Sequence, residues 1–182
     1  MSKYIRQTFE NNDGIFQLIP NLIPVKFGKP GRRLKIHPAD YYAFGVANGS
    51  IKERWLCSVS GTRVKNANRP DQGLSYVRGI DGNIFLLKDA MAELKEELIG
   101  EILQKNKCFD YATPLYFHFH PLDDLASNVG AQAKPECYYF PPQLNPHKGE
   151  RPSTYLGLNK GVSKDEVFDC IKNFGKFDTN IT

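Results

Sequence analysis

Residues 114–121 read PLYFHFHP. The run is rich in aromatic residues and has proline at both ends, which predicts a short β-strand. Because side chains alternate across a strand, Tyr116, His118 and His120 would share one face, opposite an apolar face. Two imidazoles two residues apart on one face form half of a metal site. The plainer alternative is a pair of hydrogen-bonded histidines on a half-exposed face.

A second run, KPECYYF at 134–140, predicts another short strand. The same alternation places Lys134 and Glu136 on one face of it. If the two strands face one cavity, Glu136 converges with His118 and His120. A His/His/Glu set with an open fourth position is a catalytic zinc pattern. Taken singly, Glu136 and Lys134 are each more typical of a solvated surface. The histidine pair and the Lys134/Glu136 pair both follow the alternation of side chains along a strand, and this agreement favours a metal site.

A third run, IKERWLCSVS at 51–60, also predicts a strand. Here Glu53 shares a face with Trp55 and Val59. A carboxylate on the same face as these apolar side chains is unusual, unless Glu53 lies at a solvent-exposed end of the strand.

Four other polar residues have plainer interpretations. Asp123 and Asp124 offer either an extra carboxylate to the histidines or the start of a helix, since such residues favour helix starts. His37 and His147 lie in loop-like segments flanked by proline, and we expect both at the surface.

The chain as a whole predicts a mainly β fold with helical insertions. Residues 1–14 are polar and expected to be peripheral, whereas 15–27 is apolar but carries two prolines, which is typical of an edge strand or of an extended covering segment. Apolar residues at helical spacing predict a helix over 84–104. A second helix is expected to start at a capping box of Ser163 and Glu166. The short strands are expected at 51–60, 114–121, 134–140 and 153–158.

The composition fits a single folded domain. The chain has 182 residues, of which 41% are hydrophobic and 24% charged. A net charge of +4 from scattered basic residues does not argue for a nucleic-acid partner. No apolar run approaches the ~18 residues of a membrane span, and the N-terminus does not read as a signal peptide, so we expect a cytoplasmic protein with no membrane partner. Scattered cysteines are expected to be free thiols, namely Cys57, Cys108, Cys137 and Cys170.

The sequence PLYFHFHPLDDLA at 114–126, followed by AKPECYYF at 133–140, resembles the type I mannose-6-phosphate isomerases. In that family a strand reading roughly P-L-S-x-Q-x-H-P precedes Asp-Asp and an alanine, and then Gly-Lys-x-Glu-Cys-Trp/Tyr-Tyr. Supporting similarity lies in KERWLCS at 52–58, GRRL at 31–34 and YLGLNKGVSKDEVFDCI at 155–171. The resemblance spans about residues 30–174.

The resemblance implies a zinc-dependent isomerase that interconverts mannose 6-phosphate and fructose 6-phosphate. It assigns zinc to His120 and Glu136, with His118 standing where the family has a glutamine that binds the metal. An imidazole is also a competent zinc ligand. Lys134 matches a lysine beside the metal and is the candidate catalytic residue, for proton transfer or for holding a substrate oxygen.

Two further residues are candidates for substrate binding through the same resemblance. Tyr116 stands where the family has a serine that helps to hold the sugar phosphate, so the contact itself is not implied for tyrosine. Glu53 matches the early strand glutamate of the family, with a supporting role. The expected partner is therefore a small sugar phosphate.

The fold implied by the resemblance is a cupin-type, jelly-roll-like β-barrel with helical insertions. Residues 1–29 would form a peripheral N-terminal segment, 30–174 the isomerase-like domain and 175–182 a flexible tail. Family members continue with a final histidine ligand and further strands, so we expect an incomplete barrel. The open sheet edge would be covered by a homodimer or by a partner chain of a split protein. A non-catalytic metal- or sugar-binding cupin module is the alternative to an enzyme.

Overall fold

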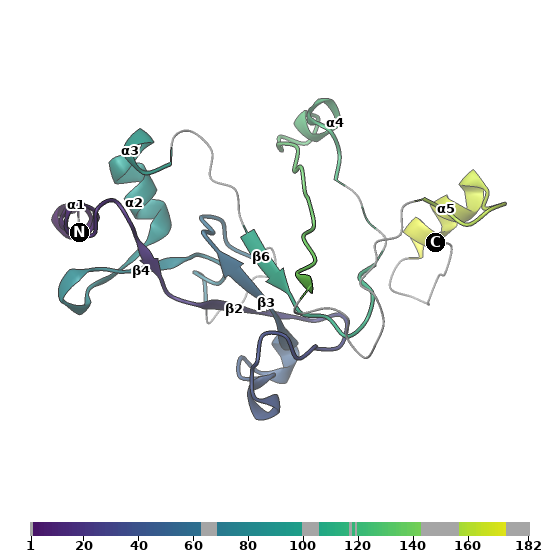
Figure 1. Cartoon of the computed structure of the whole chain (residues 1–182). Coiled ribbons are helices and arrows are strands. Elements are labelled where there is room, and N and C mark those ends of the chain that lie inside the picture. The colour runs from purple at the N-terminus through teal and green to yellow at the C-terminus, as the bar shows by residue number, and fades with distance from the viewer. Residues whose placement is uncertain are drawn as a thin grey trace. The chain divides into compact units, whose positions relative to one another are not determined.

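The computed structural model describes residues 2–62, 69–99, 106–116, 118, 120–142 and 157–173 (Figure 1). The chain divides into two compact units, Met1–Leu115 and Tyr116–Thr182. The helices are α1 (Ser2–Asn11), α2 (Leu87–Leu94), α3 (Glu96–Ile99), α4 (Asp123–Ser127) and α5 (Lys164–Lys172). The strands are β1 (Gln17–Leu18), β2 (Asn21–Val25), β3 (Ser50–Leu56), β4 (Tyr76–Arg78), β5 (Ile84–Leu86) and β6 (Asn106–Phe109). Of the helices described, none is both long enough and apolar enough to cross a membrane.

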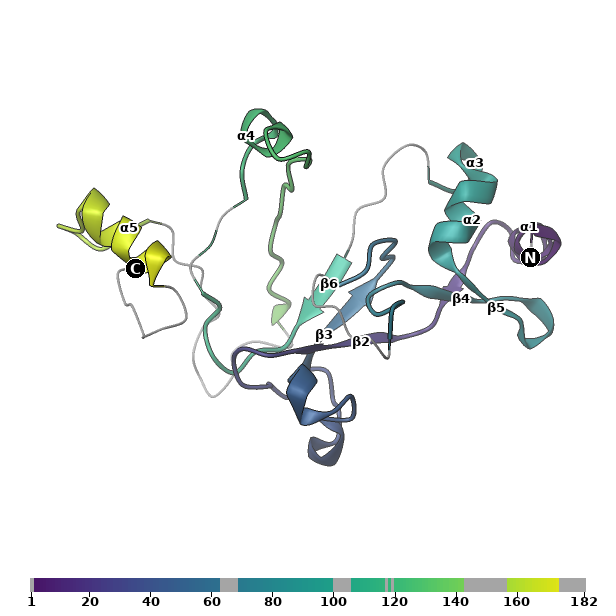
Figure 2. The ribbon, with the colours of Figure 1, turned by 180° about the vertical axis from the view of Figure 1, so that it is seen from behind.

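Two small antiparallel sheets organise the first unit. One has the strand order β1-β4-β5 and the other the order β2-β3-β6, so β3 lies between β2 and β6 (Figure 2). Within the described residues neither sheet closes into a barrel. The chain therefore has a mixed architecture of helices and antiparallel strands, and this much of the expected mainly β fold with helical insertions is confirmed.

The core of the first unit forms between helices α1 and α2 and strands β4 and β5. Its buried members are Ile5, Val77, Phe85, Leu87, Ala90 and Leu94. Ile5 is only 2% exposed, and Phe9 packs against the same cluster one turn later. The expectation that residues 1–14 are peripheral is therefore wrong. Helix α1 is amphipathic, and its apolar i, i+4 pair packs onto the core although the segment is polar on average.

Strand β2 carries one of the two prolines that predicted an edge strand. Pro24 lies in β2, at one edge of its sheet, and the register with β3 shifts between Ile23 and Pro24. Because proline has no N–H to donate to a ladder, it is tolerated at such an edge. The edge prediction for 15–27 is confirmed for β2.

The helix observed within 84–104 is shorter than the apolar pattern predicted. Residues Ile84–Leu86 form β5, and α2 ends at Leu94, because the next residue, Lys95, has a φ of 45° that is not helical. The backbone N–H of Lys95 donates to the carbonyl of Met91, and α3 follows. The remainder of the predicted helix, 100–105, lies outside the described residues.

Strand β3 buries a lysine of the first unit. Lys52 is 1% exposed, and its ammonium donates to the carbonyls of Val25 (2.7 Å) and Gly28 (3.1 Å) and to the Ser50 hydroxyl (2.7 Å). Burial lowers the pKa of Lys52, against the opposing charge of Glu53. Three oxygen acceptors thus satisfy a cation that would otherwise be costly to bury.

The second unit contains two of the expected helical features. The helix start that Asp123 and Asp124 offered forms as α4, and Ser163 caps the start of α5. The Ser163 hydroxyl accepts from the Glu166 N–H, and the Glu166 carboxylate accepts from the Ser163 N–H at 2.7 Å. The predicted capping box is confirmed. The expected tail, 175–182, and most of the strand expected at 153–158 lie outside the described residues.

The two runs that carry the histidines and the glutamate do not form strands. The described residues of 114–121 and 134–140 are irregular and make no β-ladder, so the prediction of two strands is wrong there. Proline residues in and around both runs, including Pro121 and Pro135, have no N–H to donate to a ladder.

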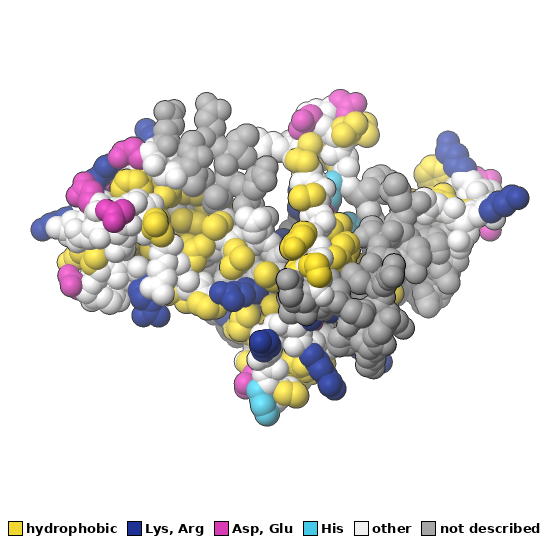
Figure 3. Space-filling view, viewed as in Figure 1, with side chains coloured by type: hydrophobic (Ala, Val, Ile, Leu, Met, Phe, Trp, Pro, Cys, Tyr) yellow, Lys and Arg dark blue, Asp and Glu magenta, His cyan; other side chains and the backbone are white. Residues whose placement is uncertain are grey.

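Many large apolar side chains of the second unit are exposed (Figure 3). They gather along α4 and the segment that follows it. The exposed residues there are Leu122, Leu125, Val129, Tyr138, Tyr139 and Phe140. Tyr138 and Phe140 stack with their ring centroids 6.4 Å apart.

Candidate metal centre

Three residues of the second unit converge on one point. His118, His120 and Glu136 each offer one ligand atom, and these atoms all lie within 4.8 Å of one another. The sequence predicted this convergence from strand alternation, and the structure produces it from two irregular segments. A zinc ion bound by all three residues would draw these atoms closer together, since nitrogen and oxygen ligands lie about 2.0–2.2 Å from zinc.

The backbone of Tyr116 orients the ring of His118. Its Nδ1 lies 2.8 Å from the carbonyl oxygen of Tyr116. Because a carbonyl only accepts, Nδ1 carries the proton and donates, which leaves the lone pair on Nε2. A second hydrogen bond of this kind is what fixes the tautomer of metal-binding histidines. His118 therefore fits the role of a neutral nitrogen ligand.

Histidine 120 lies between a cation and an anion. The Lys134 ammonium is 3.1 Å from Nε2 of His120, and the Glu136 carboxylate is 3.4 Å from the same nitrogen. Lys134 and Glu136 also form a close ion pair with each other. Burial and the Lys134 charge lower the pKa of His120, against the opposing effect of Glu136. The neutral imidazole is thereby favoured, which is the form that binds metals.

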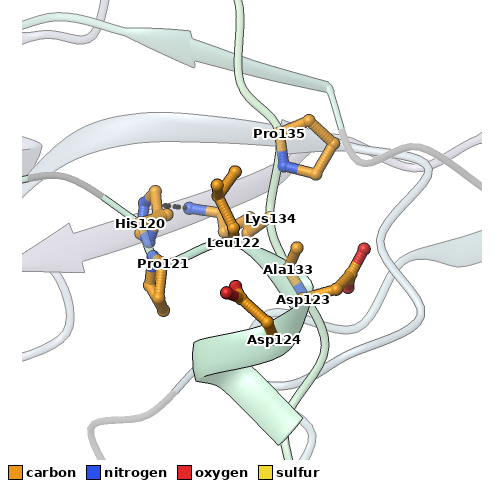
Figure 4. Close-up of a pocket in the computed structure, with 8 residues that line it drawn as sticks. All are labelled: His120, Pro121, Leu122, Asp123, Asp124, Ala133, Lys134 and Pro135. Atoms are coloured by element: carbon orange, nitrogen blue, oxygen red, sulfur yellow. Dashed lines mark hydrogen bonds between the residues drawn. The ribbon is translucent and has the colours of Figure 1, made fainter.

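A pocket of about 510 Å³ opens beside these residues (Figure 4). Asp123 Oδ1 accepts from the Ala133 N–H at 3.0 Å, which ties the start of α4 to the segment carrying Lys134. The lining residues are His120, Pro121, Leu122, Asp123, Asp124, Ala133, Lys134 and Pro135. The pocket places two carboxylates, a lysine and an imidazole around a space large enough for a small polar molecule.

The other predicted site residues lie differently. Tyr116 is exposed, and its backbone carbonyl is the group that orients His118. His37 is exposed and caps a short helical turn through Nδ1, which confirms its surface position. His147 lies outside the described residues. All four cysteines are free thiols, as predicted.

Glutamate 53 belongs to the first unit and is buried, with 7% exposure. One carboxylate oxygen accepts from the Trp55 indole N–H and the other from the Tyr111 hydroxyl, both at 2.6 Å. Lys107 adds an ammonium at 3.9 Å. The interpretation of Glu53 as a residue at a wet strand end is wrong, because β3 is the central strand of its sheet. These bonds give the carboxylate a structural role within the first unit.

Sequence reasoning missed the contact between Lys134 and His120. The alternation of side chains along a strand placed Lys134 on the same face as Glu136. It does not show how close Lys134 lies to His120, fourteen positions earlier in the chain. The buried groups Lys52 and Asp110 were also missed. For Lys52 the available signal was its position directly before Glu53 in a predicted strand. Neighbouring residues of a strand point to opposite faces, and both faces of a central strand are covered.

Comparisons of the chain with models of protein families, with curated proteins and with solved structures give no match. The resemblance to the mannose-6-phosphate isomerases stays a prediction. A function for the chain therefore rests on the chemistry of its own residues.

Proposed function

We propose that the second unit binds one divalent metal ion through His118, His120 and Glu136. The observation that carries the proposal is the approach of the three ligand atoms to within 4.8 Å of one another. Two imidazole nitrogens with one carboxylate suit zinc, and they also suit iron, manganese and nickel. The tautomer of His118 and the lowered pKa of His120 support the proposal, because both favour free ring lone pairs.

The function that these residues support best is aldose–ketose isomerisation of a hexose 6-phosphate, in a protein of the cupin-type isomerase family or in a portion of one. A bound zinc ion would polarise a substrate oxygen and stabilise negative charge on it. Lys134 lines the pocket beside His120 and is the group proposed to move a proton between C1 and C2 of the sugar. The pocket would hold the substrate.

An isomerase assay with mannose 6-phosphate and added zinc tests this function. We expect fructose 6-phosphate to form and the Lys134→Met variant to lose at least about 100-fold in rate, since general acid–base catalysis contributes roughly that much or more. Lys160→Met is the matched control, because Lys160 is an exposed lysine of the same unit. Normal activity of Lys134→Met would remove Lys134 from the proposal.

A non-catalytic metal- or sugar-binding module is the second candidate. The observation in its favour is that the carboxylates of Asp123 and Asp124 line the pocket beside His120, because two negative charges oppose the binding of a phosphate group there. Stoichiometric zinc binding with no conversion of mannose 6-phosphate would select this candidate over the enzyme.

A further inference from the structure

The ligand atoms of the proposed metal site already share a cation of the chain itself. The Lys134 ammonium donates to Nε2 of His120 at 3.1 Å and pairs closely with the carboxylate of Glu136. The imidazole has its single free lone pair on this nitrogen when it accepts from lysine. One lone pair cannot accept a hydrogen bond from an ammonium and bind a metal at the same time.

We propose that Lys134 is a built-in competitor of the metal ion: its side chain must leave His120 and Glu136 before a metal binds, and it thereby sets the metal affinity. This inference rests on the proposed metal site. The lysine side chain is half exposed, with a relative exposure of 50%, so it has solvent to move into. In the adjoining pocket the carboxylate of Asp124 also lies on the side of His120, where a displaced ammonium could meet it (Figure 4).

Two effects make the competition measurable. The ion pair and the hydrogen bond of Lys134 are lost when the metal takes their acceptors, and a positive charge next to a divalent ion is unfavourable. Both effects are moderate because the groups are partly exposed and screened by solvent. We therefore expect the lysine to weaken metal binding by about tenfold, which corresponds to about 1.4 kcal/mol.

The test is the dissociation constant for zinc, measured by competition with a chromophoric chelator at one fixed pH. Lys134→Met and Lys134→Gln, which remove the charge, are expected to bind zinc about tenfold more tightly than the wild type. Lys134→Arg, which keeps a cation, and Lys160→Met, an exposed control, should remain within about twofold of it. In the Lys134→Met background, His120→Ala should abolish the gain, which places the ion at these ligands.

Each outcome decides between the two proposals. Tight binding by Lys134→Met together with weak or undetectable binding by the wild type supports the competition. Equal or weaker binding by both neutral variants, with the wild type binding normally, would overturn the competition and leave the metal site standing. Absence of zinc binding in the wild type and in both neutral variants would overturn the metal site and the competition together.

Discussion

The Lys134 ammonium lies 3.1 Å from Nε2 of His120, the ring nitrogen that the tautomer leaves free for a ligand. Glu136 joins both groups, so a cation, an imidazole and a carboxylate form one compact set. A set of this kind favours the neutral imidazole and holds the carboxylate in place. The same geometry therefore prepares the ligands for a metal and opposes its entry.

Helix α1 is predicted to be essential to the first unit. Ile5→Ala should destabilise the unit by about 2–4 kcal/mol, because the truncation leaves a cavity in the buried cluster around α1 and α2. Urea unfolding followed by the fluorescence of Trp55, the single tryptophan, measures this. Ile15→Ala, at a residue that is 71% exposed, is the control and should change the free energy of unfolding by less than about 0.5 kcal/mol. Equal effects of the two variants would contradict the assignment of Ile5 to the core.

Lysine 52 is predicted to stabilise β3 through its ammonium. Lys52→Met keeps most of the aliphatic stem but leaves three oxygen acceptors, of which the Ser50 hydroxyl is buried, without their donor. We expect a loss of about 3 kcal/mol in the free energy of unfolding. The exposed residue Lys26 supplies the control, and Lys26→Met should have almost no effect. An unchanged stability of Lys52→Met would show that the ammonium contributes nothing net.

The hydroxyl of Tyr111 is predicted to make stability depend on alkaline pH. Burial, and then the hydrogen bond and charge of Glu53, raise the pKa of Tyr111 above its ordinary value. A raised folded-state pKa contributes stability that is fully present below about pH 10 and is lost as the pH rises further, because the unfolded chain releases the proton first.

The Tyr111→Phe variant isolates this contribution. It should be less stable than the wild type at neutral pH by about 1.5–3 kcal/mol, the usual value of a hydrogen bond to a charged group. The difference should be constant below about pH 10 and should shrink as the pH rises above it. Tyr42→Phe, at an exposed tyrosine of the same unit, should show no such trend. A difference between Tyr111→Phe and wild type that stays constant above that pH would contradict the predicted role of the hydroxyl.

The sequence was informative where local rules decide the structure. The capping box at Ser163 and Glu166, the edge position of Pro24 and the free cysteines follow from short-range chemistry or residue type. The convergence of His118, His120 and Glu136 was also predicted. Their convergence does not require strands, because any extended segment turns alternate side chains to similar sides.

The sequence was misleading where tertiary packing decides. The polar composition of residues 1–14 concealed the apolar stripe of α1, because average polarity does not show which face a helix buries. Glu53 is buried because β3 is central in its sheet, and strand order is set by contacts far apart in the chain. The approach of Lys134 to His120 is likewise a long-range contact, and residue spacing alone does not determine it.

The zinc content of the purified protein is the most direct test of the proposed metal site. Equilibrium dialysis against zinc should load one equivalent per chain on the wild type and on His37→Ala, which removes an exposed histidine elsewhere. His120→Ala and Glu136→Ala should each bind zinc more weakly by at least about 100-fold, since each loses one of three protein ligands. Less than about a tenth of an equivalent on both the wild type and Lys134→Met, or undiminished binding by both ligand variants, would contradict the site.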